Sequence, residues 1–520
     1  KPTIRREVSM FWSIRLALLS LVIVLAAAQV PGYAQSSAAA LLQQSANAMG
    51  GLTALRALKT QVIESEGKQF DSSSTPQPLG PTRQITTFRY TLTRDLTQPR
   101  FRLQWEGQSL AGDQTVRFVE IIDGSAGMLQ EGGGKQIRLH PGRLATRLRE
   151  EQRNPVRLIL VALNQKSLRQ RGDAEIDGKR YTVLSFTESG DEFRIYIDAQ
   201  TRLPAQTEIL EDDPLEGDSS YMLRYGDWRK VDRVLLPFSL RYELNGRALQ
   251  EEQIKSIRHD APLAGDVFAI PESVRSEKTD AKPIASQWIL RRVAGNVSYQ
   301  DMGRAPVIQW VELAPGVHKI QGSSHATILV EMRDHLVAIE GPLYEARTAP
   351  VIKSIKERFP GKPIRYAIPT HHHLDHAGGI RAFMAESAAI IVPFNAQAFY
   401  AKVARAPHTR NPDSLERNKG AIVIEGFGGG PRVLSDGARQ VEVYPLPTSH
   451  AEDLVVVYLP KERLLIEADH ISPRDGQVRP GPRVKEFVQE LDKLKLDVAT
   501  IVGIHGDQAS LEATRAAAKK

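Results

Sequence analysis

Residues 369–379 read PTHHHLDHAGG and place four histidines and one aspartate within six residues. The whole chain has only 13 histidines among 520 residues. The preceding segment, residues 363–370, is largely apolar and bounded by prolines, so we predict a buried strand there, followed by a helix after the motif. An unpaired polar group is costly in a packed core. We therefore expect the motif in a loop at the edge of an α/β layer, where such layers place their functional sites.

Three later polar residues follow apolar segments in the same way. His450, Asp469 and His505 each end a run that we predict to be a strand, so all three can converge on the edge that carries the motif. The chain has no cysteine, so a metal site must use imidazole and carboxylate ligands, a set that suits zinc and can also hold iron or manganese. The candidate metal ligands are His371, His373, Asp375, His376, His450, Asp469 and His505.

The pattern H-x-H-x-D-H, followed by His, Asp and His at successive strand ends, resembles the metallo-β-lactamase superfamily over about residues 305–520. This resemblance implies an α/β fold, the αββα sandwich, and a site for two Zn²⁺ ions. It also implies catalytic roles for Asp375 and Asp469. It assigns His371, His373 and His450 to the first metal, Asp375, His376 and His505 to the second, and Asp469 to both.

The spacing within the motif has a physical reason. In an extended loop His371 and His373 point to the same side, because residues two apart share a face, and His372 then points away. We expect His372 to be an outward-facing loop histidine. Gly378 and Gly379 are expected to allow a tight turn into the helix.

The resemblance predicts an exported metal-dependent hydrolase in which a metal-bound hydroxide attacks an ester, lactone, amide or related bond of a small-molecule substrate. His325 and His470 are candidates for the substrate wall. Three alternatives stay open: β-lactamase activity proper, a mononuclear iron enzyme similar to the persulfide dioxygenases, and a non-catalytic protein that binds a lipid or a partner.

The N-terminal part has a different pattern of predicted secondary structure. Residues 36–59 are helical in pattern with a break at Gly50-Gly51, and short alternating strands follow as far as about residue 270, interrupted by a helical segment at residues 142–164. The order of these pieces resembles the periplasmic lipoprotein carriers, which implies an antiparallel half-barrel able to contact a lipid or acyl chain. We predict a signal peptide at 1–34, a β-rich half-barrel-like domain at 36–272, a linker at 273–300 and a metallo-β-lactamase-fold domain at 301–520.

The N-terminus is typical of a secretory signal. Met10 and Arg15 precede a nearly continuous apolar run at residues 16–28, which is too short for a comfortable membrane span. We therefore expect a periplasmic or secreted protein with no integral membrane domain after signal removal. The net charge is +7, of which the first 34 residues carry +3, and the remaining charge is too small and scattered to indicate a nucleic-acid partner.

Overall fold

The computed structural model describes residues 37–71, 73–110, 115–278, 306–322 and 324–520. The predicted signal peptide and residues 279–300 of the predicted linker lie outside the described residues. Within the described ranges, no helix has the length and apolar character needed to cross a bilayer. Residues 37–278 are called the N-terminal half below, and residues 306–520 the C-terminal half.

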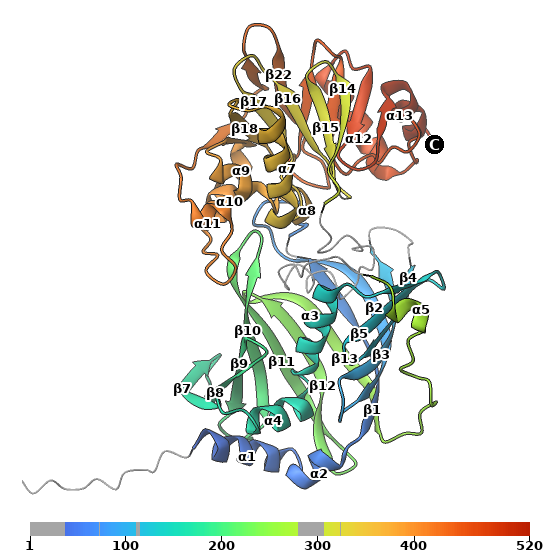
Figure 1. The fold of residues 1–520 in the computed structure, drawn as a ribbon, viewed down its shortest axis with the longest axis vertical. Coiled ribbons are helices and arrows are strands. Elements are labelled where there is room, and N and C mark those ends of the chain that lie inside the picture. The colour runs from blue at the N-terminus through green and yellow to red at the C-terminus, as the bar shows by residue number, and fades with distance from the viewer. Residues whose placement is uncertain (1–36, 72, 111–114, 279–305, 323) are drawn as a thin grey trace, which may run out of the picture.

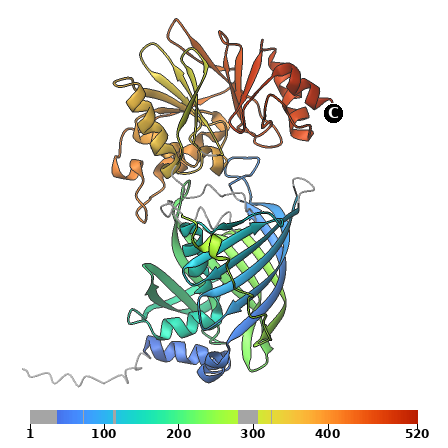
Figure 2. The same ribbon diagram turned by 45° about the vertical axis from the view of Figure 1, so that its right-hand side comes forward.

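The N-terminal half is built on one 13-stranded sheet whose paired strands are all antiparallel (Figures 1 and 2). The sheet order is β6-β5-β4-β3-β2-β1-β13-β12-β11-β10-β9-β8-β7, so the first and last strands pair at its middle. The strands are β1 (Thr60–Asp71), β2 (Arg83–Asp95), β3 (Arg100–Ser109), β4 (Thr115–Asp123), β5 (Ala126–Glu131), β6 (Gln136–Arg138), β7 (Arg169–Ile176), β8 (Lys179–Glu188), β9 (Asp191–Asp198), β10 (Pro204–Asp213), β11 (Gly217–Val231), β12 (Val234–Leu244) and β13 (Arg247–His259).

Helices cover the concave face of this sheet. The sheet curves around α3 (Pro141–Glu151) and α4 (Pro155–Leu163), which connect its two edge strands, while α1 (Ala38–Ala48) and α2 (Leu52–Ala57) close one end (Figure 1). Proline begins both connecting helices, where a missing N–H costs nothing. Apolar residues of α1, α2 and α4 form one core with inward-facing residues of the strands.

The segment that begins the predicted linker packs on this sheet. Residues Glu272–Arg275 form α5, and Val274 lies in a small buried cluster with Ile121 and Met128. The Glu277 carboxylate accepts a hydrogen bond from Arg138 N at 2.7 Å. Residues 272–278 thus belong structurally to the N-terminal half.

The C-terminal half contains two sheets. The first, in the order β14-β15-β16-β17-β18-β19-β20, is parallel from β17 to β20, and the second has the order β21-β22-β23-β24-β25-β26. The first sheet comprises β14 (Gln309–Ala314), β15 (Val317–Gln321), β16 (Thr327–Glu331), β17 (Leu336–Ile339), β18 (Ile364–Ile368), β19 (Ala389–Pro393) and β20 (Ile424–Phe427). The second comprises β21 (Arg432–Ser435), β22 (Gln440–Pro445), β23 (Val455–Leu459), β24 (Leu464–Glu467), β25 (Thr500–Gly503) and β26 (Gln508–Ser510).

These sheets form the middle of a four-layer sandwich. Buried valines and isoleucines from both sheets share one core, which places the sheets face to face. A second core joins the outer face of the first sheet to one set of helices, and a third joins the second sheet to the last two helices. The helices are α7 (Glu345–Arg358), α8 (Leu374–Ala377), α9 (Ile380–Ala385), α10 (Phe394–Arg405), α11 (Ser414–Arg417), α12 (Pro482–Leu494) and α13 (Leu511–Ala518). The predicted fold class, an αββα layered domain after a large antiparallel sheet, is confirmed.

Two hairpins of the N-terminal sheet contact the C-terminal half. The connection between β1 and β2 reaches the histidine motif, as described below. The turn between β10 and β11 contacts the segment after α10, where His408 Nδ1 lies 2.8 Å from Asp212 Oδ1 and Arg410 N donates to Asp218 Oδ1 at 3.0 Å. Leu215 of the same turn is buried in the helix-covered core of the C-terminal half.

Candidate metal centre

Strand ends position the motif and its partners. β18 ends at Ile368, the three consecutive histidines follow in the loop, and α8 then carries Asp375 and His376. His450 lies in the loop between β22 and β23, while Asp469 and His505 come two residues after the ends of β24 and β25. All seven residues predicted as ligands lie at one edge of the sandwich.

The structure brings these side chains together as two groups. In each group the ligand-type atoms all lie within 4.8 Å of one another. One group consists of His371, His373, His450 and Asp469, and the other of His325, Asp375, His376 and His505. The second group contains His325, which the resemblance does not assign to a metal, and Asp469, which the resemblance assigns to both metals, is found in the first group.

The Asp469 carboxylate lies between the two groups. Its Oδ2 is 2.8 Å from His450 Nε2, and its Oδ1 is 2.8 Å from His505 Nε2 and 3.0 Å from His376 Nε2. Each group therefore faces one oxygen of the same carboxylate.

Partners behind the ligands fix their orientation. His376 Nδ1 lies 2.6 Å from Glu340 Oε2, and both side chains are fully buried. The other oxygen of Glu340 accepts from Thr370 N at 2.6 Å. His371 Nδ1 has the Thr370 hydroxyl at 3.1 Å. In both histidines the Nε2 atom is left facing the groups, as metal ligation requires.

Burial also sets the charge of the imidazoles. It lowers the pKa of His371 well below its ordinary value, assisted by His376 and His373, and lowers the pKa of His373 to about 3. Burial opposes protonation of His376 as well, but the carboxylates of Asp469, Glu340 and Asp375 outweigh it and raise that pKa well above the ordinary value. The neutral state of His371 and His373 suits metal ligation, because a metal needs the unprotonated nitrogen.

Two carboxylate residues of the site have strained backbones. Asp469 has φ 71° and Glu340 has φ 78°, which is the left-handed region that side chains rarely adopt. Each such residue costs on the order of 1–3 kcal/mol. The surrounding sandwich maintains this strain at two carboxylates that lie within 3.0 Å of His376.

The two glycines after the motif have a different role from the predicted one. Gly378 has φ −63° and Gly379 has φ −100°, so neither uses the left-handed freedom of glycine. A Cβ atom on Gly378 would lie 2.1 Å from the Leu343 carbonyl oxygen, and one on Gly379 would lie 2.1 Å from Thr348 Oγ1. The glycines allow close packing beneath the motif.

The expectation that His372 faces outward is wrong. His372 is only 1% exposed. Its Nδ1 lies 2.6 Å from Oδ1 of the buried Asp453, and its Nε2 lies 3.4 Å from Thr75 Oγ1. It does point away from the two groups, but into a buried contact with the β22–β23 loop and the N-terminal half. The alternation of side chains along an extended loop predicts the side to which His372 points, but not which other segment covers that side.

The two candidates for the substrate wall differ. His325 Nε2 lies 3.5 Å from Asp375 Oδ2, and its ring centroid is 4.1 Å from that of His505, so it belongs among the ligand-type residues. His470 lies outside both groups: its Nδ1 donates to Ala468 O at 3.0 Å, and its ring stacks on Phe487. This position favours a structural role for His470 over contact with substrate.

Some residues of the site carry no sequence signal. Thr75 belongs to the N-terminal half, yet its carbonyl oxygen accepts from His373 Nε2 at 2.9 Å. Asp453 stands in the segment Ser449–Asp453, which reads SHAED, and nothing local distinguishes its carboxylate from the neighbouring Glu452. Only the folded chain shows which of the two acidic residues faces the motif.

The fold and site define an αββα protein with two neighbouring His/Asp groups at one sheet edge. Residues 341–505 match the model of the metallo-beta-lactamase superfamily. The chain thus carries a C-terminal domain of that superfamily, as the sequence motif predicts. A comparison with curated proteins found no match.

A comparison with solved structures gives matches to part of the chain at low identity and low TM-score. They include a metallo-beta-lactamase from Pontibacter korlensis (16% identity, TM-score 0.32), and the match covers 41% of this chain and 97% of that protein's chain. The mono-zinc form of the metallo-beta-lactamase FIM-1 from Pseudomonas aeruginosa (18%, 0.32) covers 41% and 93%. A metallo-beta-lactamase from Hirschia baltica (18%, 0.31) covers 41% and 96%.

Proposed function

We propose that this protein is a hydrolase that holds two divalent metal ions, expected to be zinc, and acts on an ester, lactone, amide or related bond of a small molecule. The observation that carries the proposal is the position of Asp469, whose two oxygens face the two groups of ligand-type side chains. A carboxylate in this place can neutralise two cations at once.

The donor set fits the metal. Imidazoles predominate in the first group, with one carboxylate, and the chain has no cysteine to supply a thiolate. Imidazole and carboxylate are ligands that zinc, iron and manganese accept, and zinc favours the nitrogen-rich set. A pair of such ions would supply an activated water at neutral pH and polarise the oxygen of the bond to be cleaved.

The chain's own residues supply orientation and charge. Glu340 and Thr370 orient the imidazoles of His376 and His371 toward the site. Asp375 lies at the exposed side of the second group, with a side chain 21% exposed, where it can accept a proton from an incoming nucleophile. Asp469 balances positive charge between the groups.

Metal analysis and an activity screen on the same preparation test the proposal. The purified chain should contain about two divalent ions and hydrolyse a member of a panel of lactones, β-lactams, thioesters and phosphodiesters. Removal of the metal with a chelator should abolish that activity, and added zinc should restore it. One tightly held iron with sulfur-oxidising activity would favour the dioxygenase alternative. A chain that takes up no divalent metal would contradict the proposal.

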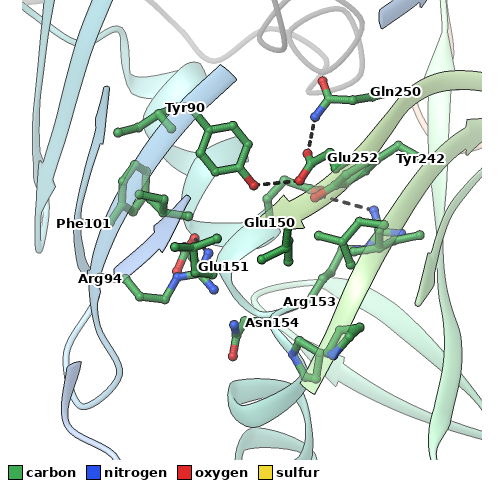
Figure 3. Close-up of a pocket in the computed structure, with 18 of the residues that line it drawn as sticks. Tyr90, Arg94, Phe101, Glu150, Glu151, Arg153, Asn154, Tyr242, Gln250 and Glu252 are labelled. Carbon is green, nitrogen blue, oxygen red and sulfur yellow. Dashed lines mark hydrogen bonds and ion pairs between the residues drawn. The ribbon is translucent and has the colours of Figure 1, made fainter. Parts of the chain in front are cut away.

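A cavity in the N-terminal half supports a second proposal, that this half binds the apolar part of a small amphiphile such as an acyl compound. The cavity has a volume of about 160 Å³ and lies between the concave face of the sheet and the α3–α4 connection (Figure 3). Its walls include Phe101, Trp105, Leu236 and Leu240. A cavity of about 150 Å³ holds benzene, so a ring or a short acyl segment fits.

One side of the cavity is polar. Arg94 pairs with Glu151 at 3.1 Å, Arg153 pairs with Glu150 at 3.4 Å, and Tyr90 donates to Glu252 at 2.7 Å (Figure 3). The charged side chains that line the cavity therefore have partners in the protein, so the occupant does not need a charged headgroup to neutralise them. We expect the occupant to place its apolar part among the aromatic walls.

Binding of octanoate and of octanol, measured by calorimetry, tests this second proposal. Leu240→Trp should fill the cavity and weaken binding at least tenfold, whereas Leu210→Trp, at an exposed position of β10, should leave it unchanged. Absence of binding to the unaltered chain, or equal binding by both variants, would contradict it.

We also propose that the chain is exported to the periplasm or secreted, and that it divides into two domains. The sequence predicts them at residues 36–272 and 301–520, and the packing of α5 extends the first to residue 278. The apolar run at residues 16–28 supports export. Cell fractionation with mass analysis of the mature N-terminus tests the first point, and limited proteolysis between residues 279 and 300 tests the second. Retention of residues 1–34 on a cytoplasmic protein would contradict export.

A further inference from the structure

The connection between β1 and β2 docks on the histidine motif. Leu374 N donates to Ser73 O at 3.3 Å, and His373 Nε2 lies 2.9 Å from Thr75 O. Glu452 N, in the β22–β23 loop, donates to Pro76 O at 2.7 Å. These contacts join residues about 300 or more positions apart in the chain.

The docked segment is unusually buried for a hairpin connection. Ser73 is 6% exposed and Thr75 is 1% exposed, whereas such connections normally run over the surface. Their backbone groups find partners in the C-terminal half, which accounts for the burial of polar main chain.

Internal hydrogen bonds hold the segment in shape. Asp71 Oδ1 accepts from Ser73 N at 2.7 Å and from Ser73 Oγ at 2.6 Å, and Asp71 Oδ2 accepts from Ser74 Oγ at 2.9 Å. Thr75 Oγ1 donates to Gln77 O at 2.7 Å. These hydrogen bonds direct the Thr75 carbonyl at His373.

The contact with His373 determines which ring nitrogen carries the proton. A carbonyl oxygen can only accept, so His373 Nε2 must be the donor. In a neutral imidazole the other nitrogen, Nδ1, then has the lone pair that a metal requires. His371 and His376 instead receive their orienting partners, Thr370 and Glu340, from the C-terminal half itself.

We propose that residues Ser73–Gln77 of the β1–β2 connection are part of the metal centre, with the Thr75 carbonyl as the positioning group that fixes His373 in the Nε2–H form. This inference rests on the proposed metal function. It assigns the N-terminal half a structural role at the metal centre, so the C-terminal half alone lacks an orienting partner for one ligand. Loss of such a partner typically weakens metal binding 10–100-fold.

Zinc titration of the full chain, in competition with a chromophoric chelator, tests the proposal. Asp71→Ala removes the carboxylate that accepts hydrogen bonds from Ser73 and Ser74. It should lower the affinity for one of the two zinc ions by about 10–100-fold and leave the affinity for the other unchanged. Asp198→Ala is the matched control. Asp198 Oδ1 accepts from Gln200 N at 2.9 Å and Thr201 N at 2.8 Å, in the turn between β9 and β10. That variant should bind both ions as the unaltered chain does.

A second measurement does not depend on a variant. Nitrogen-15 spectra of histidine in the zinc-loaded chain should show His373 with its proton on Nε2, identified by loss of one signal set in His373→Gln. Equal zinc affinity in Asp71→Ala and Asp198→Ala, or a proton on Nδ1 of His373, would overturn the proposal while leaving the proposed function intact. An unaltered chain that binds no zinc would overturn both.

Discussion

His372 Nδ1 lies 2.6 Å from Asp453 Oδ1, and both side chains are almost fully buried. This pair joins the central histidine of the motif to the loop that carries His450. It is close to the two groups of ligand-type residues and belongs to neither. We therefore expect His372 to contribute to the stability of the fold, whereas its neighbours His371 and His373 contribute to metal binding.

His372→Ala should lower the free energy of unfolding by about 3 kcal/mol or more, because it leaves the Asp453 carboxylate buried without its partner. Both metals should remain bound, since His372 faces away from them. The free energy is measured by denaturant unfolding, and the metal content on the same sample. His335→Ala is the control, because His335 Nδ1 likewise lies 2.7 Å from an aspartate oxygen, Asp334 Oδ1. The Asp334 side chain is 64% exposed, so water can solvate its carboxylate after the substitution and the loss of stability should be smaller. A loss of metal in His372→Ala would contradict the assignment of His371 and His373, and not His372, as metal ligands.

Asp469→Ala should remove the negative charge between the two groups, so that one metal is lost or weakened. Turnover should fall by at least roughly two orders of magnitude, which corresponds to about 3 kcal/mol in the barrier. Metal content and rate are measured together, on the substrate that the screen identifies.

Asp475→Ala controls for the backbone at this position. Asp475 is exposed and, like Asp469, has a left-handed backbone, with φ 50° against 71°. The two variants share the conformational cost of alanine at positive φ and differ in proximity to the site. If both reduce metal content equally, the effect comes from backbone strain and not from the missing ligand.

The sequence predicted those parts of the structure that depend on local pattern. The motif after β18 and the polar residues after β24 and β25 are each recognisable from an apolar run followed by a His or Asp. The helical face of α12 depends equally on local pattern, because Val484, Phe487, Val488 and Leu491 recur at helical spacing and are buried. Strand ends converge because the sheet topology places them at one edge.

The parts that were missed depend on contacts between distant segments. Asp453 meets His372 across 81 residues, and Thr75 meets His373 across 298. No periodicity reports which loop will cover a given side of a motif. The role of Gly378 differs from the predicted one for the same reason, because only the packing brings the Leu343 carbonyl to the place that a Cβ would occupy.

Glu340→Gln should weaken the metal of the second group by about 10–100-fold, as is typical for loss of a partner behind a ligating histidine. The carboxylate accepts from both His376 Nδ1 and Thr370 N, at 2.6 Å each. An amide has one accepting oxygen and a donating nitrogen, so it must lose one of these bonds. Zinc affinity is measured by chelator competition. Asp436→Asn, which makes the same change of chemistry at a surface turn, should have no effect on it.

His325→Ala should weaken binding of the second group's metal, because the ligand-type atoms of His325, Asp375, His376 and His505 lie within 4.8 Å of one another. Arg347 Nη2 donates to the His325 carbonyl at 2.6 Å, so the backbone that carries this imidazole is held in place whatever the side chain. The expected result is a reduced zinc affinity for one ion, measured by chelator competition, with the first ion unaffected.

His470→Ala is the matched variant for His325→Ala. Both imidazoles are buried, and burial lowers the pKa of each, to about 3 for His325 and to about 4 for His470, so the two substitutions remove neutral rings of equal size. His470 packs on Phe487 outside both groups, and its loss should lower stability while both metals stay bound. If instead His325→Ala keeps both ions at unchanged affinity and raises only KM for the substrate, His325 is a substrate contact and the second metal has Asp375, His376 and His505 as its ligands from that group.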